Sequence, residues 1–293
     1  MDRDQNVDRE RWLERRVLAY AHQGGAWEGP SSTLYAIRRA IAAGATGIEL
    51  DVHATVDGHL VVTHDPTVDR TTDGSGEIAA LTLAELRELD NAYWWAEGAD
   101  VSPGLPGDAY PFRGRAPEDR AFGVATLEEV LDEFRGVILN LDIKRTAPAV
   151  EPYEHALADL LHAFGRRDDV IVASFLDAAT DAFAAVAPDI PTSAGTVAVA
   201  DFVRAVRAGE EPPRLRHVAL QVPASYGDVT VVDEGLVEAA HGAGLAVHVW
   251  TIEEEDEMDR LCDLGVDGII TDRPSVLAGV LERRGERWAP PSR

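Results

Sequence analysis

Two carboxylates that stand two residues apart give the first chemical signal in this sequence. Glu49 and Asp51 belong to the short apolar run "TGIELDV" (46–52). In an extended strand, residues i and i+2 point to the same face, so these carboxylates lie together and repel each other unless a cation separates them. Asp142 adds a third carboxylate in the run "LNLDIK". Three converging carboxylates suit a hard divalent cation, Mg²⁺ or Ca²⁺. The alternative is an acidic rim paired with Lys and Arg.

Two histidines stand at the ends of similar apolar runs. His22 ends "RVLAYAH" and His64 ends "HLVVTH". Imidazole titrates near neutrality, so such a pair can act as general base and general acid. Zinc is the alternative metal for this residue set, but carboxylates outnumber the candidate histidines, which favours a harder ion. We expect His53 and His59 to be structural.

The elements that must position these residues are eight apolar, β-branched runs alternating with amphipathic helices. The predicted strands span residues 16–22, 46–52, 136–143, 170–175, 191–195, 217–222, 246–252 and 267–272. Near-continuous apolar runs are typical of parallel strands buried on both faces. Thr82 and Thr126 are each followed three residues later by Glu, the spacing of a helix capping box. The pattern predicts an α/β fold, a (β/α)₈ barrel of the TIM type, with its site at the carboxyl ends of the strands. A doubly wound open sheet is the alternative.

One region breaks the alternation. Residues 53–125 contain a short extra strand, one helix and a long irregular stretch rich in Tyr and Trp. A loop this long inside a barrel is usually functional, so we interpret it as an insertion after the second strand, within one domain over residues 14–284. We expect flexible ends at residues 1–13 and 285–293. The aromatic cluster either packs the insertion onto the barrel or offers an apolar surface to substrate.

Composition limits the classes of function. The formal net charge of −25 opposes binding to nucleic acid and anionic lipid. The single cysteine, Cys262, excludes an intrachain disulfide and fits a reducing compartment. The charged N-terminus lacks the apolar core of a secretory signal, and no run approaches the length of a membrane-spanning helix. We therefore expect a cytoplasmic protein without an integral membrane segment.

Several ordered motifs resemble one family. The segments "AHQGG", "PSSTLYAI", "GIELDV", "LVVTHDPTVDRTTDG", "LNLDIK", "VHVWTI" and "GIITDRP" are similar to those of glycerophosphodiester phosphodiesterases, from about Ala21 to Pro274. The resemblance implies a (β/α)₈ barrel that hydrolyses glycerophosphodiesters to glycerol 3-phosphate and an alcohol, with a divalent cation.

The resemblance also implies roles for single residues. His22 and His64 match the acid/base pair, and Glu49, Asp51 and Asp142 match the metal ligands. Substrate-binding roles are expected of four further residues. Lys144 falls on a lysine near the phosphate, Trp250 on an aromatic residue near the glycerol, Gln23 on an arginine, and Gln221 is a polar residue of the sixth strand.

The sequence departs from the family pattern at three places. The family usually reads His-Arg-Gly and Pro-Glu-Asn-Thr, whereas this chain has Gln23 for the arginine, Ser31 for the glutamate and Ser32 for the asparagine. Asp142 is one methylene shorter than the usual glutamate. Losing a cation and an anion together leaves the local charge unchanged, so we expect the changes at Gln23 and Ser31 to be linked.

Three functions remain open from the sequence. The first is metal-dependent hydrolysis of a small-molecule glycerophosphodiester. The second is a lysophospholipase D-type activity, with transient contact to lipid through the apolar residues of the insertion. The third is a catalytically impaired homologue that binds phosphodiesters without turnover. A purely structural role would leave the polar strand ends unexplained.

Overall fold

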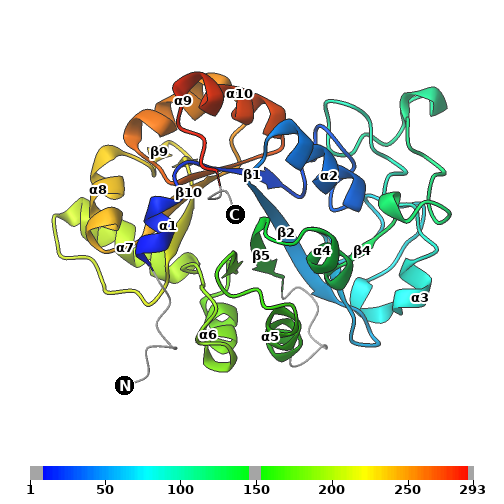
Figure 1. The fold of residues 1–293 in the computed structure, drawn as a ribbon, viewed down its shortest axis with the longest axis horizontal. Coiled ribbons are helices and arrows are strands. Elements are labelled where there is room, and N and C mark those ends of the chain that lie inside the picture. The colour runs from blue at the N-terminus through cyan, green and yellow to red at the C-terminus, as the bar shows by residue number, and fades with distance from the viewer. Residues whose placement is uncertain (1–8, 145–152, 290–293) are drawn as a thin grey trace.

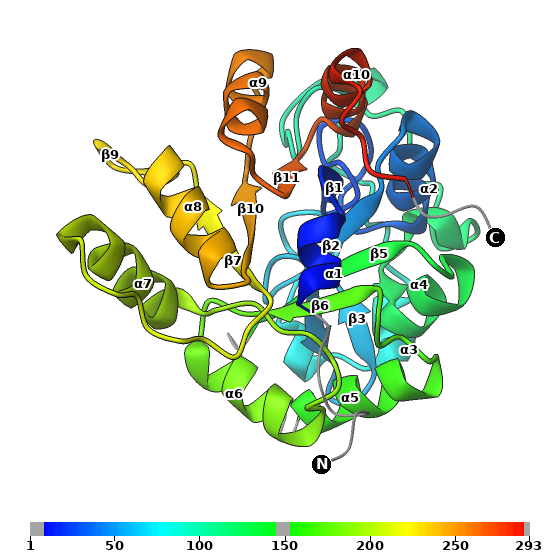
Figure 2. The same cartoon turned by 60° about the vertical axis from the view of Figure 1, so that its left-hand side comes forward.

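The computed structural model describes residues 9–144 and 153–289. Seven parallel strands form most of a ring, and helices lie outside it (Figures 1 and 2). The strands are β1 (Leu18–His22), β2 (Gly47–Ala54), β5 (Ile138–Ile143), β6 (Val170–Ala173), β7 (Ala219–Pro223), β10 (Ala246–Trp250) and β11 (Gly268–Thr271).

Strand pairing closes this ring. β1 pairs in parallel with both β2 and β11, the sheet continues through β5 to β6 on one side, and it continues through β10 to β7 on the other. Between β6 and β7, Thr192 forms a parallel bridge with Val172, and Ser193 forms one with Ala219. The predicted strand at 191–195 is therefore the eighth and shortest member. The predicted (β/α)₈ barrel is confirmed, and the open-sheet alternative is wrong because the bridges through Thr192 and Ser193 join the two edge strands, β6 and β7.

A helix follows each member of the ring before the next begins. These helices are α2 (Leu34–Ala43), α4 (Leu127–Glu133), α5 (Tyr153–Ala163), α6 (Asp177–Val186), α7 (Thr196–Ala208), α8 (Glu234–Gly242), α9 (Glu255–Leu264) and α10 (Pro274–Arg284). Both predicted capping boxes are present, at Thr82 and at Thr126. Each box satisfies two backbone N–H groups that the first helical turn leaves unpaired. The helix that begins after Thr82 is the single turn α3 (Leu83–Leu86).

The barrel interior changes from apolar to polar along the strands. Tyr20 of β1, Ile138 of β5 and Ile270 of β11 belong to one buried cluster inside the ring. Tyr20 lies level with Gly47 of β2, where an added Cβ would approach the Tyr20 ring to 2.6 Å. One step of two residues further along β1 stands His22, level with Glu49. The apolar layers therefore form a floor, and the polar residues follow at the carboxyl ends.

The insertion begins where β2 leaves the barrel. β3 (Leu60–Val62) pairs antiparallel with the end of β2 and with β4 (Ala125–Thr126). Between β3 and β4 lie α3 and three single turns of 3₁₀-helix: η2 (Ile78–Ala80), η3 (Gly107–Ala109) and η4 (Arg120–Phe122). A small hairpin of β8 (Ser225–Tyr226) and β9 (Val229–Thr230) follows β7. No helix in the described part of the chain is long and apolar enough to cross a membrane.

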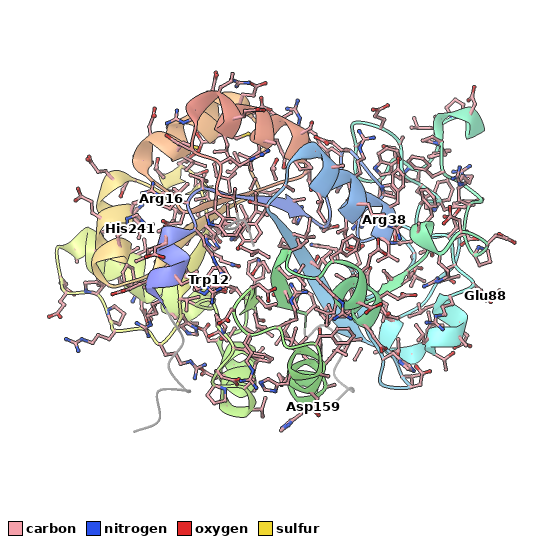
Figure 3. All side chains as sticks on the ribbon, in the orientation of Figure 1. Trp12, Arg16, Arg38, Glu88, Asp159 and His241 are labelled. Carbon is pink, nitrogen blue, oxygen red and sulfur yellow. The ribbon has the colours of Figure 1, made fainter. Side chains whose placement is uncertain are left out.

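The inner parts of both predicted flexible ends are packed against the barrel. Helix α1 (Glu10–Glu14) carries Trp12, labelled in Figure 3, which is 1% exposed and joins the interior cluster. The backbone N–H of Val17 donates to the carbonyl of Glu286, and the N–H of Trp288 donates back to Val17. Residues 1–8 and 290–293, also predicted to be flexible, lie outside the described residues.

His248 of β10 makes the stability of this interior dependent on pH. Its side chain is fully buried beside Tyr20, and neither ring nitrogen has a hydrogen-bond partner among the described residues. Burial lowers the pKa of His248 to about 4, against about 6.5 in an unfolded chain. Since the unfolded state binds the proton more readily, His248 stabilises the fold above pH ~6.5, and this stability is lost as the pH falls toward 4.

We predict that His248→Gln weakens this pH dependence. Between pH 7 and pH 4, the free energy of unfolding should fall by about 3 kcal/mol more in the unmodified protein than in the variant. The reason is that the variant lacks the titration of His248 and keeps all other titrating groups. Urea unfolding at both pH values measures the difference. Equal losses in the two proteins would contradict a buried, neutral His248.

Candidate active site

The barrel brings six of the predicted site residues to one end. His22, Glu49 and Asp51 come from the carboxyl ends of β1 and β2, and the register places Asp51 directly beside Asp142 of β5. Lys144 follows β5 by one residue. His64 arrives from the insertion, just past β3, with its ring centroid 6.4 Å from that of His22 and edge-on to it. Parallel strands of a barrel end at the same rim, which is why residues distant in sequence meet here.

The three carboxylates are almost fully buried. Glu49 is 6% exposed, Asp51 1% and Asp142 6%. The Nζ of Lys144 lies 2.9 Å from Asp51 Oδ1 and 2.9 Å from Asp142 Oδ2. Lys144 is the chain's only lysine, and its compact ammonium can donate to both carboxylates at once.

Burial and mutual repulsion shift the pKa values of the carboxylates in this cluster. Burial, together with the charge of Asp51, raises the pKa of Glu49 to about 8. Burial also raises the pKa of Asp142 to about 6, although Lys144 opposes this shift. Burial would lower the pKa of Lys144, but the charges of Asp51 and Asp142 raise it above its ordinary value. Within the described residues, the charges of Lys144 and His22 therefore offset these rises only in part.

The cluster fits a hard cation in its chemistry. Asp51 Oδ2 and Asp142 Oδ1 are buried and lack a hydrogen-bond partner within the described residues, and carboxylate oxygens are the ligands that Mg²⁺ and Ca²⁺ prefer. In this conformation, however, no three His, Cys, Asp or Glu side chains of the described ranges are grouped closely enough to hold a metal ion. Lys144 lies between two of the three expected ligands.

His22 is held by a residue that was not predicted as part of the site. Its Nδ1 lies 2.6 Å from Oδ1 of Asp272, which follows β11. Its Nε2 is 3.9 Å from Glu49 and 3.2 Å from the side-chain amide of Gln23. Burial would lower the pKa of His22, but the hydrogen bond to Asp272 and the charge of Glu49 raise it to about 9. Asp272 stood at a strand end in the sequence, which was the available signal.

His64 has a carboxylate partner of its own. Its Nδ1 is 2.7 Å from Oδ1 of the adjacent Asp65, and Arg70 binds the same carboxylate. The ring nitrogen Nε2 of His53 contacts the carbonyl of His64 at 3.3 Å, which fits the structural role expected of His53. Each histidine of the pair thus has Nδ1 fixed by an aspartate.

The remaining predicted substrate contacts border this cluster. Gln221 of β7 exchanges two hydrogen bonds with Asn140 of β5, at 2.9 and 3.2 Å, so its amide braces the barrel. Trp250 ends β10 and meets Phe175 edge-on at 5.5 Å, and Lys144 lies 5.3 Å from the same Phe175 ring. A role for Gln221 and Trp250 in substrate binding stays a prediction.

Comparison with known proteins identifies the family. The model of the glycerophosphoryl diester phosphodiesterase family matches residues 22–276. A glycerophosphodiester phosphodiesterase from Caldanaerobacter subterraneus is 30% identical over 92% of this chain and 100% of the relative, and one from Bacillus subtilis is 30% identical over 89% of this chain and 85% of the relative. The chain belongs to the glycerophosphoryl diester phosphodiesterase family.

Solved structures agree on the fold. A glycerophosphoryl diester phosphodiesterase domain from Mycobacterium tuberculosis superposes with a TM-score of 0.73 at 21% identity, covering 92% of this chain and 99% of that one. A phosphodiesterase from Oleispira antarctica, solved with the product sn-glycerol-3-phosphate, has a TM-score of 0.66 at 22% identity, covering 92% and 99%.

The residues by which this family member departs from the usual pattern lie next to one another. The N–H of Ser32 donates to the carbonyl of Gln23 at 2.7 Å, and the N–H of Gln23 donates to Glu49 at 3.2 Å. Gln23 and Ser32 both have positive φ, 51° and 57°, a conformation that costs energy for residues other than glycine. Gln23 Oε1 and Ser32 Oγ are buried without partners among the described residues. The expected linkage between Gln23 and Ser31 stays a prediction.

The aromatic residues of the insertion pack against each other. The guanidinium of Arg113 lies over the rings of Tyr93, Trp94 and Tyr110 at 4.2, 4.7 and 3.7 Å. The indole of Trp95 is 4% exposed, stacks on Phe112 and donates to the carbonyl of Ala26. These contacts favour the packing role over an open surface for a lipid-like alcohol.

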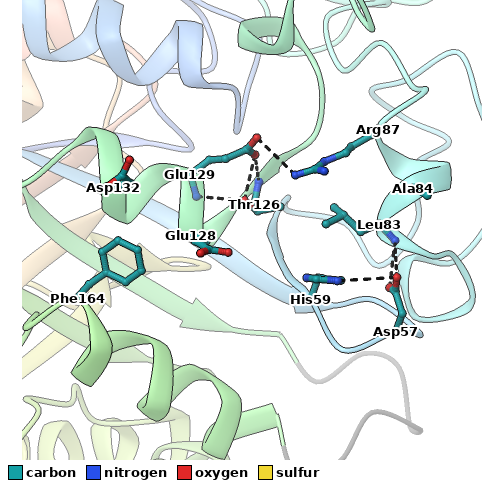
Figure 4. Close-up of a pocket in the computed structure, with 10 residues that line it drawn as sticks. All are labelled: Asp57, His59, Leu83, Ala84, Arg87, Thr126, Glu128, Glu129, Asp132 and Phe164. Atoms are coloured by element: carbon teal, nitrogen blue, oxygen red, sulfur yellow. Dashed lines mark hydrogen bonds and ion pairs between the residues drawn. The ribbon is translucent and has the colours of Figure 1, made fainter.

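A separate pocket lies beside the insertion and contains none of the predicted site residues (Figure 4). Its polar groups serve local structure: Glu129 closes the capping box at Thr126, and Asp57 accepts from the N–H of Leu83. His59 faces Asp57 across 4.0 Å, in keeping with the structural role expected of His59.

We predict that Lys144→Met destabilises the metal-free protein by about 3 kcal/mol, because two buried carboxylates lose their cation. Added Mg²⁺ or Ca²⁺ should recover more stability in this variant than in the unmodified protein. Urea unfolding in chelator and in each metal measures both effects.

The control is Arg135→Met, which removes an exposed ion pair with Asp132 and should cost under about 1 kcal/mol. A loss no larger than that of the control would show that Lys144 does not support the carboxylates.

Proposed function

We propose that this chain hydrolyses glycerophosphodiesters to glycerol 3-phosphate and an alcohol, with a divalent cation and with His22 and His64 as the acid/base pair. The observation that carries the proposal is the meeting of two aspartate-bound histidines, with ring centroids 6.4 Å apart, beside a buried carboxylate cluster. Family membership supports the reaction class, and the product complex of the Oleispira antarctica relative supports glycerol 3-phosphate as product.

The carboxylates and Lys144 form the electrostatic half of the proposed site. Glu49, Asp51 and Asp142 would hold Mg²⁺ or Ca²⁺, whose charge stabilises the negative charge that develops on the phosphoryl oxygens. Lys144 lies at the same carboxylates and supplies a second positive charge. Such charge matters here because the protein as a whole is strongly acidic, with a formal net charge of −25, and would repel a phosphodiester.

The histidines form the proton-transfer half. Because Asp272 and Asp65 bind the Nδ1 atoms of His22 and His64, Nε2 is the atom of each ring that can exchange a proton with substrate. At His22 this atom contacts the side-chain amide of Gln23. One histidine takes the proton of the attacking hydroxyl, and the other donates a proton to the leaving alkoxide. The attacker is either water or the substrate's own glycerol hydroxyl, and the second case passes through a cyclic phosphate.

We predict metal-dependent release of glycerol 3-phosphate, measured on glycerophosphocholine, glycerophosphoethanolamine and lysophosphatidylcholine with Mg²⁺, Ca²⁺ or chelator. His22→Ala and His64→Ala should each lower kcat about 10²- to 10⁴-fold, the usual contribution of a general acid or base. The packed aromatic cluster leads us to expect faster turnover of the two soluble diesters than of the lysophospholipid.

The matched control is His59→Ala, which alters a histidine outside the site and should keep full activity. Near-normal rates in both site variants would end the acid/base proposal. Stabilisation by metal without any product would favour the impaired, binding-only homologue.

We also predict that Gln23 and Ser31 are energetically coupled. Gln23 is 3% exposed and Ser31 4%, so Gln23→Arg alone buries a guanidinium without the glutamate that accompanies it in the family, and should lower stability. The double variant Gln23→Arg/Ser31→Glu should regain that stability and lower KM, because an arginine fork binds phosphate more strongly than an amide does. Thermal unfolding and steady-state kinetics of the unmodified protein, Gln23→Arg, Ser31→Glu and the double variant measure the coupling. Additive effects of the two single substitutions would argue against it.

A further inference from the structure

Three charged side chains of the insertion, Asp65, Arg70 and Asp100, are linked in a row that ends at His64. The Nδ1 of His64 is 2.7 Å from Oδ1 of Asp65, and the Nε of Arg70 is 2.5 Å from Oδ2 of the same carboxylate. The terminal NH2 of Arg70 lies 3.3 Å from Asp65 Oδ1, and its other terminal nitrogen bonds to Asp100. Arg70 therefore binds Asp65 through Nε and one terminal nitrogen, and it binds Asp100 through the other terminal nitrogen.

Asp100 belongs to the irregular part of the insertion, and that part is tied to the loop after β1. The backbone N–H of Gly98 donates to the carbonyl of Trp27 at 3.0 Å, and the indole N–H of Trp95 donates to the carbonyl of Ala26 at 2.8 Å. On the other side, the indole of Trp94 donates to the carbonyl of Thr72 at 3.0 Å. These bonds fix the backbone that carries Asp100 relative to the segment that follows His22.

His64 needs such support more than His22 does. The side chain of His64 is 42% exposed, whereas that of His22 is 21% exposed. An exposed ring has few packing contacts to restrict its rotation, so its orientation depends on the bond to Asp65. The bond to His64 comes first among the causes that hold the pKa of Asp65 below its ordinary range, and Arg70 adds to it. Asp65 thus remains an ionised acceptor.

We propose that Arg70 and Asp100 are positioning residues for His64: Asp100 holds Arg70, Arg70 fixes the carboxylate of Asp65, and Asp65 orients the imidazole. This proposal rests on the proposed function of His64 as one of the two proton-transfer groups. It assigns the insertion a task in catalysis, namely to set the direction of a histidine that the barrel itself does not hold.

Arg70 is less suited to bind the substrate phosphate directly. All three guanidinium nitrogens already contact carboxylate oxygens. Binding a phosphate would require breaking at least one of these charge-assisted bonds, which are the strong ones among protein hydrogen bonds. The two roles differ in kinetics, because a phosphate contact acts on KM, whereas the orientation of a proton-transfer group acts on kcat.

The test is a double-mutant cycle on glycerophosphocholine at saturating Mg²⁺. Arg70→Met should lower kcat about 10- to 100-fold, by analogy with the loss seen when a residue that orients a metal ligand is removed, with KM within about twofold. Asp65→Asn should lower kcat by at least as much. The double variant should be no slower than Asp65→Asn, because Arg70 acts through Asp65. Asp100→Asn should give a smaller loss in the same direction.

The matched control is Arg113→Met. Arg113 is a second arginine of the insertion that packs on aromatic rings and contacts Tyr93 rather than Asp65. It should affect unfolding but leave kcat nearly unchanged. Three results would overturn the proposal: Arg70→Met with the kcat of the control, multiplicative losses in the double variant, or a raised KM at unchanged kcat.

A second measurement separates this proposal from the proposed function. If the unmodified protein releases no product, the proposed function fails, and ¹⁵N-histidine NMR of the same variants then tests the positioning alone. The His64 signal, identified by its loss in His64→Ala, should show a proton on Nδ1 in the unmodified protein and in Arg113→Met, and a mixture of tautomers in Arg70→Met. An unchanged tautomer in Arg70→Met would refute the role of Arg70.

Discussion

Asp51 and Asp142 stand at the same level of two neighbouring parallel strands, so backbone pairing alone holds their carboxylates side by side. Glu49 lies two residues below Asp51 on the same face, and all three are nearly excluded from water. Burying neighbouring negative charges together in a low dielectric lowers the stability of the fold by several kcal/mol unless a positive charge is present. The sole lysine of the chain meets part of this need. The remaining need is the electrostatic basis of the cation site that we propose.

The same electrostatic demand reaches the histidines. Glu49 accepts from the backbone of Gln23 and faces His22, so its charge is one of the reasons why the pKa of His22 is raised to about 9. A cation held by Glu49 would remove part of that effect, because it neutralises the charge that favours the imidazolium. In the proposed function, cation binding and proton transfer would therefore be linked through Glu49. The barrel supplies the link by placing His22 and Glu49 in register on β1 and β2.

How much of this could be read from the sequence depended on whether the signal was local. Strand runs, capping boxes at Thr82 and Thr126, and the alternation that puts Glu49 and Asp51 on one face all follow from neighbouring residues, and the structure has them. The pairings of His22 with Asp272 and of Asn140 with Gln221 span 250 and 81 residues. Spacing along the chain contains no information on such partners; only closure of the ring brings them together. Arg70 was hidden for a different reason, since an arginine in a loop has many acidic neighbours in a chain this acidic.

The two histidines reach the site by different structural means, and this difference bears on how the site can change. His22 stands on a barrel strand, and its partner Asp272 follows the neighbouring strand β11, so the closed ring sets their geometry. His64 follows the antiparallel strand β3 and depends on a loop network for its direction. The barrel end at β1 and β2 is constrained by pairing on both sides, whereas the insertion can vary in length and packing without opening the ring.

The unusual residues Gln23 and Ser32 follow β1 and are joined by a backbone hydrogen bond, and each has a strained backbone conformation. Strain that the surroundings maintain at such a point is typical of a functional position, and these two residues stand where the family usually has an arginine and an asparagine.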